Sequence, residues 1–204
     1  KITTILYKSN HWNSKLSKIK ELKIGKFITI VNNYCFNSSQ QLQKVILPDT
    51  IRKLGWKSFS YCYELSEINI KENIFLDDQV FYNCFKLTSL KIPNNNLYIG
   101  SNLLFNCTSL KSVEISESCL EILSHAFDNC TNIEHINIPN KVKKIREYAF
   151  YNCTSLQSLI ISDSVVEINQ NAFSYCTCLE SVQFGKNITN IEKQSFSFCQ
   201  KLPN

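Results

Sequence analysis

Apolar residues return along this chain at an almost constant step. The clearest mark is a small residue followed by a large apolar one, as in "AFDNCTNI", "AFYNCTSL" and "AFSYCTCL". The large apolar residue, hereafter the Phe column, advances in steps of 23, 22, 23, 23, 23, 23 and 23. Its members are Phe36, Phe59, Phe81, Leu104, Phe127, Phe150, Phe173 and Phe196. Such regularity is the signature of a repeat architecture, in which each repeat forms one structural unit.

Further apolar columns keep the same step. In the repeat around Phe127 they lie five residues before it, at Ile122, and six, nine and eleven residues after it, at Ile133, Ile136 and Ile138. The last two positions alternate with polar residues, which predicts a short, half-buried strand. Proline directly follows this strand in three repeats and ends it. These prolines are Pro48, Pro93 and Pro139.

A single unit of this length cannot bury its own apolar side, whereas stacked units cover one another. The pattern therefore predicts one domain, a solenoid of about eight coils that consists mostly of strand and turn. Its strands would pair in parallel at about 4.8 Å per coil, giving a curved rod on the order of 40 Å long.

The consensus I-x-x-x-A-F-x-x-C-x-x-L-x-x-I-x-I-P resembles that of the BspA-like leucine-rich repeat family over roughly residues 19–202. Ile145, Phe150, Cys153 and Leu159 follow it, and Ser162 replaces the proline. The resemblance implies an α/β-type solenoid, a right-handed superhelix with a parallel β-sheet on its concave face. It also implies a non-catalytic role. Some members are surface adhesins that bind host matrix proteins, and others are repeats attached to further domains.

The two ends of the repeat array are less regular. We interpret residues 1–25 as a divergent N-terminal capping coil and residues 26–204 as the solenoid proper, within the same domain. Leu16, Ile19, Leu22 and Ile24 fall on the columns of that earlier coil, and Trp12 lies near its missing aromatic pair. No polar cap follows the last repeat, so either the natural chain continues or this end associates end to end with a partner.

Seven of the ten cysteines occupy one column, three residues after the Phe column. We expect a ladder of small, buried, unpaired thiols, since free cysteine is among the most buried residue types. A disulfide framework is the weaker alternative, because it needs facing Cβ vectors that an in-register ladder does not provide. The column consists of Cys62, Cys84, Cys107, Cys130, Cys153, Cys176 and Cys199, and the remaining cysteines are Cys35, Cys119 and Cys178.

The net charge of +5 is unevenly placed. Residues 1–26 hold seven lysines against Glu21, or 7 − 1 = +6, so the remaining chain sums to −1. We expect these lysines to form a solvated cap, with contact to acidic lipid or protein as the alternative. No apolar run has the roughly 20 residues of a membrane helix, so no integral membrane segment is expected.

Motifs for catalysis are missing from the sequence. It holds no glycine-rich phosphate loop, no G-x-S-x-G and no H-E-x-x-H. His11, His125 and His135 have no partner at a fixed spacing, and the Cys-x-Cys of Cys176 and Cys178 is a weak metal signal without a second pair. We therefore expect no enzyme, no cofactor and no metal site.

Residues between the buried strand positions must point outward, onto the concave sheet. They form two rows, eight and ten residues after the Phe column, and constitute the predicted protein-binding face. Their mixed charges argue against a nucleic-acid surface. The first row is Lys44, Glu67, Ser89, Ser112, His135, Ser158 and Ser181; the second is Ile46, Asn69, Lys91, Glu114, Asn137, Ile160 and Gln183.

Aromatic residues flanking the cysteine column are a second candidate surface. They suit interface anchors, although packing between adjacent coils is the simpler interpretation. They are Tyr61, Tyr63, Tyr82, Phe85, Phe105, Tyr151, Tyr175 and Phe198.

Five Asn-x-Ser/Thr sequons occur, and three of them arise from the repeated "NCT". They matter only in a secreted protein, and the repeat consensus explains them more simply. Buried free thiols favour a cytoplasmic location, and the cell surface stays as the alternative. The sequons begin at Asn37, Asn106, Asn129, Asn152 and Asn187.

These features predict a non-catalytic scaffold that binds a protein partner through the concave face of the solenoid. One alternative is a surface adhesin that binds host or matrix proteins. Another is a targeting or regulatory repeat attached to a catalytic domain or subunit.

Overall fold

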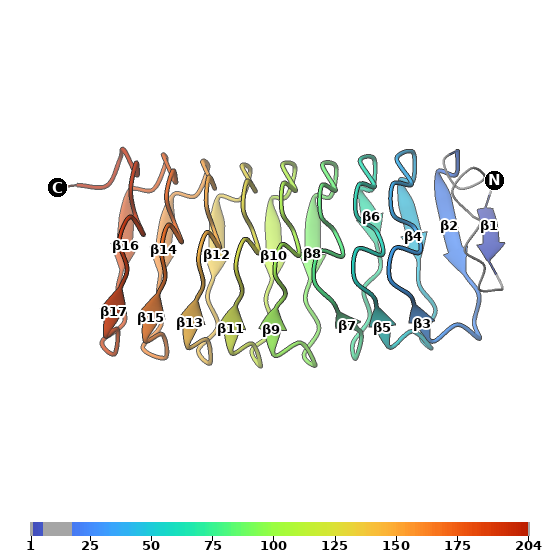
Figure 1. Ribbon diagram of the computed structural model, residues 1–204, viewed down its shortest axis with the longest axis horizontal. Helices are drawn as coiled ribbons and strands as arrows, with labels where there is room; N and C mark the ends of the chain where they lie inside the picture. The colour runs from blue at the N-terminus through green and yellow to red at the C-terminus, as the bar shows by residue number, and fades with distance from the viewer. Residues whose placement is uncertain (1, 6–17, 204) are drawn as a thin grey trace.

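The computed structural model describes residues 2–5 and 18–203 of the chain. Figure 1 shows one rod of stacked coils, with the two chain ends at opposite ends of the stack. Trp12 and Leu16, which the sequence assigns to the N-terminal coil, lie outside the described residues, as does His11. The described part of that coil supplies Leu22 and Ile24, and both side chains are buried.

A first row of parallel strands occupies the predicted position in the seven repeats from Phe36 to Phe173. Parallel pairing joins the strands of this row in three separate blocks, which are β1-β2-β4-β6, β8-β10 and β12-β14-β16. The strands are β1 (Ile2–Ile5), β2 (Glu21–Ile24), β4 (Lys44–Ile46), β6 (Glu67–Ile68), β8 (Ser89–Lys91), β10 (Ser112–Glu114), β12 (His135–Asn137), β14 (Ser158–Ile160) and β16 (Ser181–Gln183).

A second row of parallel strands, which the sequence reading missed, forms around the apolar column that precedes the Phe column. Each strand has two residues, too few to show an alternating pattern. Figure 1 shows this row beside the first. The strands are β3 (Ile30–Val31), β5 (Lys53–Leu54), β7 (Phe75–Leu76), β9 (Tyr98–Ile99), β11 (Glu121–Ile122), β13 (Lys144–Ile145), β15 (Glu167–Ile168) and β17 (Asn190–Ile191).

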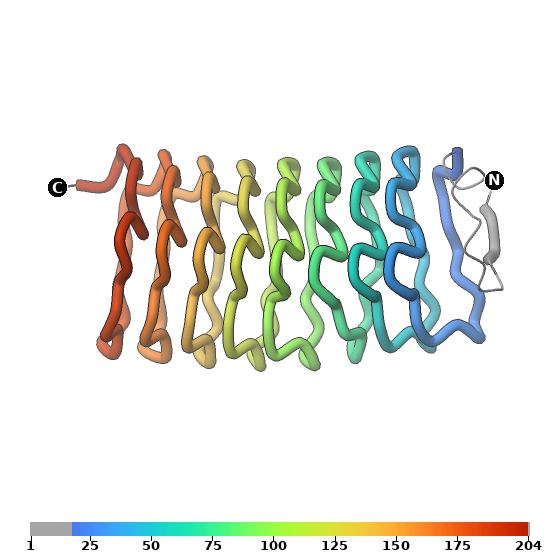
Figure 2. The backbone as a smooth tube through the Cα atoms, viewed as in Figure 1, coloured from blue at the N-terminus to red at the C-terminus, as the bar shows by residue number. Residues whose placement is uncertain are grey.

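The solenoid is therefore mostly strand and turn, as expected, and helix is absent from residues 2–5 and 18–203. The described part of the chain accordingly holds no helix long and apolar enough to cross a membrane. Figure 2 shows the coils as one continuous winding, each beside the next.

Hydrogen bonds at the turn next to the Phe column also join successive coils. The Phe127 backbone N–H donates to the Ala149 carbonyl at 2.8 Å, and the Phe150 N–H donates to the Ala172 carbonyl at 2.7 Å. This turn bonds every coil to the next, and most coils also pair with a neighbour through one or both strand rows. These bonds satisfy backbone groups that the stack would otherwise bury unpaired.

The core consists of the predicted columns, stacked along the rod. The Phe127, Phe150 and Phe173 rings lie parallel, with centroids 4.9 and 5.0 Å apart, and none of the three is accessible to solvent. Leu104 takes the place of a ring in one coil and is equally buried. Stacking of this kind adds to the stability gained from apolar burial.

The cysteine column is confirmed as a ladder of buried, unpaired thiols. All ten cysteines are free, and only Cys35 and Cys178 are partly exposed. The column also contributes hydrogen bonds, because each thiol donates to the backbone carbonyl of the Phe-column residue in the preceding coil. Cys130 Sγ, for example, lies 3.1 Å from the Leu104 carbonyl oxygen, and the seven distances run from 3.1 to 3.4 Å.

Candidate functional site

The fourteen side chains of the predicted binding rows lie on the outward side of the first sheet. The residue between each pair points into the core. It is buried at Val45, Leu90, Ile136 and Leu159 and partly buried at Ile68, Val113 and Val182. Lys44 and Ile46 are half-buried and the other twelve are exposed. Ile160, with 63% of its surface accessible, is the most prominent apolar group of this face.

Strand register aligns these side chains within each block of paired strands. Lys91 pairs with Glu114 across β8 and β10, and His135, Ser158 and Ser181 are aligned across β12, β14 and β16. The Asn69 side chain, by contrast, forms hydrogen bonds within the fold. Its amide accepts a hydrogen bond from the Leu47 N–H at 2.6 Å and donates to the Leu47 carbonyl at 3.1 Å, which continues the ladder beyond the short β6.

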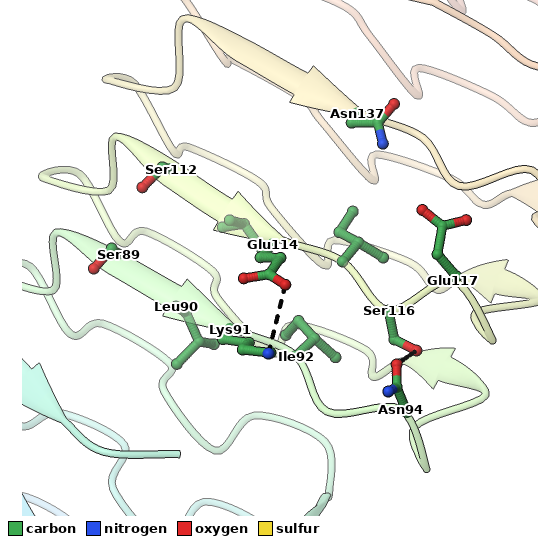
Figure 3. Close-up of a pocket in the computed structure, with 12 residues that line it drawn as sticks. Ser89, Leu90, Lys91, Ile92, Asn94, Ser112, Glu114, Ser116, Glu117 and Asn137 are labelled. Carbon is green, nitrogen blue, oxygen red and sulfur yellow. Dashed lines mark hydrogen bonds and ion pairs between the residues drawn. The ribbon is translucent and has the colours of Figure 1, made fainter. Parts of the chain in front are cut away.

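A groove of about 540 Å³ opens at the middle of this face, over β8 and β10. Figure 3 shows that it extends from the strands to the turns that follow them, where Asn94, Ser116 and Glu117 lie. Five residues of the predicted rows line it, and the turn residues were not predicted, because nothing in the sequence places them beside the strands. The five are Ser89, Lys91, Ser112, Glu114 and Asn137.

The groove is polar and carries more negative than positive charge. Lys91 Nζ lies 2.9 Å from Glu72 and 3.6 Å from Glu114. The hydrogen bond with Glu72 raises the pKa of Lys91 and lowers the pKa of Glu72. Of these carboxylates only Glu114 lines the groove, and Glu117 is the second carboxylate of its lining. Ser116 is buried, and its hydroxyl donates a hydrogen bond to the Asn94 side chain at 3.0 Å. The arrangement suits polar recognition of a partner with basic and hydrogen-bonding groups.

The described residues show no constellation for chemistry on this face. His135 is exposed, and no carboxylate or hydroxyl in the described ranges forms a hydrogen bond with its ring. Residues 2–5 and 18–203 likewise hold no group of three His, Cys, Asp or Glu side chains placed to bind a metal ion.

His125 has a partner that sequence reading missed. Its Nδ1 lies 2.8 Å from Asp128 Oδ2, three residues along the chain. The imidazole stacks on the Tyr148 ring with centroids 4.8 Å apart. Burial is the main influence on Asp128 and raises its pKa, against the lowering by His125. The pair belongs to the turn next to the Phe column.

The flanking aromatic residues stack from coil to coil along this turn, as the simpler interpretation predicts. Tyr82 and Phe105 are parallel at 4.7 Å, and Tyr175 and Phe198 at 4.5 Å. Only Tyr175 and Phe198 among the eight predicted aromatics are exposed. Their rings therefore contribute chiefly to coil packing.

The "NCT" asparagines form a ladder of their own. Asn106 Nδ2 donates to Asn83 Oδ1 at 2.7 Å, Asn129 Nδ2 donates to Asn106 Oδ1, and Asn152 Nδ2 donates to Asn129 Oδ1 at 2.6 Å. The Asn187 Nδ2 donates to the Asp163 carbonyl at 2.9 Å, so the nitrogen that would carry a sugar is engaged in the fold at four of the five sequons. This ladder gives the repeated sequon a structural cause.

Solved structures of leucine-rich repeat proteins share this fold. A T. pallidum leucine-rich repeat protein aligns with a TM-score of 0.62 and 21% identity, over 91% of this chain and 78% of the other. A leucine-rich cell surface protein from Faecalibacterium prausnitzii aligns with a TM-score of 0.55 and 20% identity, over 90% and 72%. The pneumococcal vaccine antigen PcpA aligns at 0.50 and 16%, over 90% and 66%.

The comparison with curated proteins finds no match. The family described as "BspA type Leucine rich repeat region" matches residues 8–76 and 75–203, in six copies. The chain belongs to the BspA-type leucine-rich repeat family.

Proposed function

We propose that this chain is a non-catalytic scaffold that binds a protein partner through the outward face of its first sheet. The observation that carries the proposal is the groove over β8 and β10, lined by five side chains of one exposed face. Solenoid sheets offer extended surfaces of this kind, and membership of a leucine-rich repeat family supports the same role.

The chemistry of the groove defines the partner segment it would accept. Hydroxyls of Ser89 and Ser112, the amide of Asn137 and the carboxylate of Glu117 face a space of about 540 Å³. A segment with a lysine or arginine beside hydrogen-bonding groups would match this surface. Charge complementarity there would determine specificity and the rate of association more than affinity.

The test compares captured partners between two arginine variants. Ser112→Arg fills the groove, and Asn190→Arg places the same side chain on exposed β17 of the second sheet. Immobilised wild-type protein and both variants would be exposed to cell extract and to intact cell surfaces, and bound proteins quantified. Partners specific to the groove should fall by on the order of tenfold with Ser112→Arg and stay with Asn190→Arg. An identical set of partners with Ser112→Arg would contradict the proposal.

A role at the cell surface is a second candidate, supported by the names of two structural neighbours. One is called a cell surface protein and another a vaccine antigen. Detection of the chain on intact, unpermeabilised cells by antibody would support this location. Signal that appears only after permeabilisation would exclude it.

A further inference from the structure

The outward column of the second sheet changes character halfway along the rod. In β3, β5, β7 and β9 it holds Ile30, Lys53, Phe75 and Tyr98, and register aligns the first three directly. In the second half of the rod, ion pairs cover the same surface. Lys144 lies 2.8 Å from Glu167, and Arg146 lies 2.7 Å from Glu121.

The first half of this column thus exposes large apolar side chains, whereas the second half exposes charged side chains that form ion pairs with one another. The accessible fractions are 80% for Phe27, 49% for Ile30, 41% for Phe75 and 47% for Tyr98. Of eleven exposed large apolar residues in the described chain, six lie between residues 27 and 98. Exposed apolar groups gathered in this way mark an interaction surface.

Lysine ammonium groups lie against the rings of this surface. Lys26 Nζ lies 5.2 Å from the Phe27 ring centroid, and Lys53 Nζ lies 5.4 Å from that of Phe75. Lys53 also pairs with Asp77 at 2.7 Å, whereas Lys26 pairs with no carboxylate in the described chain. We call this surface the aromatic–lysine patch, and it consists of Lys26, Phe27, Ile30, Lys53, Phe75 and Tyr98.

The surrounding charge is strongly positive. Residues 18–58 hold eight lysines and arginines against two acidic residues, or 8 − 2 = +6, and residues 59–203 hold eleven against fifteen, or 11 − 15 = −4. The rod is therefore polarised along its length, and four residues of the patch, Lys26, Phe27, Ile30 and Lys53, belong to the basic segment. Two copies that met patch to patch would bring like charges together, which disfavours a second copy as the occupant.

We propose that the aromatic–lysine patch binds the surface of an anionic lipid bilayer. Aromatic rings with lysines beside them are the combination found at membrane interfaces, where the rings enter the headgroup region and the ammonium groups meet lipid phosphates. The groove lies over strands of the first row, whereas the patch column lies on the second row, so a protein partner and a bilayer would use different strands. This inference does not depend on the proposed protein-binding role.

The experiment uses the whole chain with sedimented lipid vesicles. Vesicles of phosphatidylcholine alone are compared with vesicles that contain about one-third phosphatidylserine, at low and at physiological salt. The patch variant is Lys26→Glu/Phe27→Ser, two changes next to each other at the surface. The matched control is Lys141→Glu/Ile160→Ser, which removes an exposed lysine and an exposed isoleucine elsewhere.

We expect wild type and control to bind the anionic vesicles, more weakly at physiological than at low salt, and not to bind the neutral vesicles. The patch variant should bind at least about tenfold more weakly. Equal binding by the patch and control variants, or no preference for anionic vesicles, would overturn the proposal. So would strong competition by soluble glycerophosphoserine, which would indicate a site for a free phosphate compound. A dimer that the patch variant abolishes in sedimentation would assign the patch to a second copy instead.

Discussion

At the scale of single residues, the cysteine column shows why one residue type recurs. A buried position beside the Phe column must be small, yet it also faces a backbone carbonyl of the preceding coil. Cys107 meets both requirements, because its thiol is inaccessible and lies 3.2 Å from the Phe81 carbonyl oxygen. Alanine would leave that carbonyl without the donor, and valine would exceed the space. The sequence predicts the burial, whereas the hydrogen bond depends on the offset between coils.

Burial of these thiols makes stability fall at alkaline pH. It raises the pKa of Cys62 and Cys107 to about 12, against 9.0 for an ordinary cysteine. Below pH 9 both states keep the proton and stability is complete. Above pH 9 these two thiols ionise in the unfolded chain but keep their protons in the folded chain, so stability falls until about pH 12. Each such thiol should lower the free energy of unfolding by up to ~1.4 kcal/mol per pH unit.

Urea unfolding between neutral pH and pH 10.5, under reducing conditions, measures this slope. Cys107→Ala should reduce the slope by about one proton, whatever its effect on stability at neutral pH. A Cys107→Ala slope equal to that of wild type would show that the buried thiol ionises as freely in the folded chain as in the unfolded one.

At the scale of one coil, the turn around the Phe column depends on left-handed backbone. Each of the eight repeats has a non-glycine residue at positive φ two residues before that column and another two residues after it. The residues before are Tyr34, Lys57, Gln79, Asn102, His125, Tyr148, Asn171 and Gln194; those after are Ser38, Tyr61, Asn83, Asn106, Asn129, Asn152, Tyr175 and Phe198. Asparagine tolerates this conformation best among them, which explains its place in "NCT".

Two variants separate the backbone and side-chain roles of Asn129, whose φ is 60°. Asn129→Gly keeps the left-handed conformation and loses the amide bonds to Asn106 and Asn152, at a cost of about 1 kcal/mol. Asn129→Ala also meets the steric penalty of that conformation, and should cost about 1 kcal/mol more. Thermal or urea unfolding of both measures the difference. If alanine were as stable as glycine there, backbone strain would not be the reason for asparagine.

The same coil shows what sequence could and could not predict. The first strand row follows from the alternation at Ile136 and Ile138, and the stack follows from the constant step. The second strand row was not predicted, because a two-residue strand such as β11 is too short to show an alternation of apolar and polar residues. The groove was not predicted for another reason. Its walls include Asn94 and Glu117, whose approach to the strands is set by the path of the turns.

At the scale of the whole molecule, the rod is held together by contacts between neighbouring coils, because distant coils do not touch. Stability in such a solenoid is approximately a sum of coil terms and interface terms. Interior coils have two interfaces. The last described coil has one, and its Ile191 and Phe184 are exposed at columns that are buried in the interior, such as Ile168 and Ile161. The same core substitution should therefore have a cost that depends on where along the rod it is made.

Phe150→Ala and Phe196→Ala test this dependence. Phe150 stacks on rings on both sides, at 4.9 Å from Phe127 and 5.0 Å from Phe173, and its loss should cost about 3–5 kcal/mol. Phe196 is partly exposed, stacks face to face on one ring, Phe173, at 5.2 Å, and has the exposed Phe184 edge-on at 5.6 Å, so about half that cost is expected. Because Phe150 lies inside the stack, its loss should also uncouple the coils on either side and broaden urea unfolding into two steps. Phe196→Ala should leave a single transition. Equal costs with single transitions in both variants would show that the rod unfolds as one indivisible unit, with no separable interface terms.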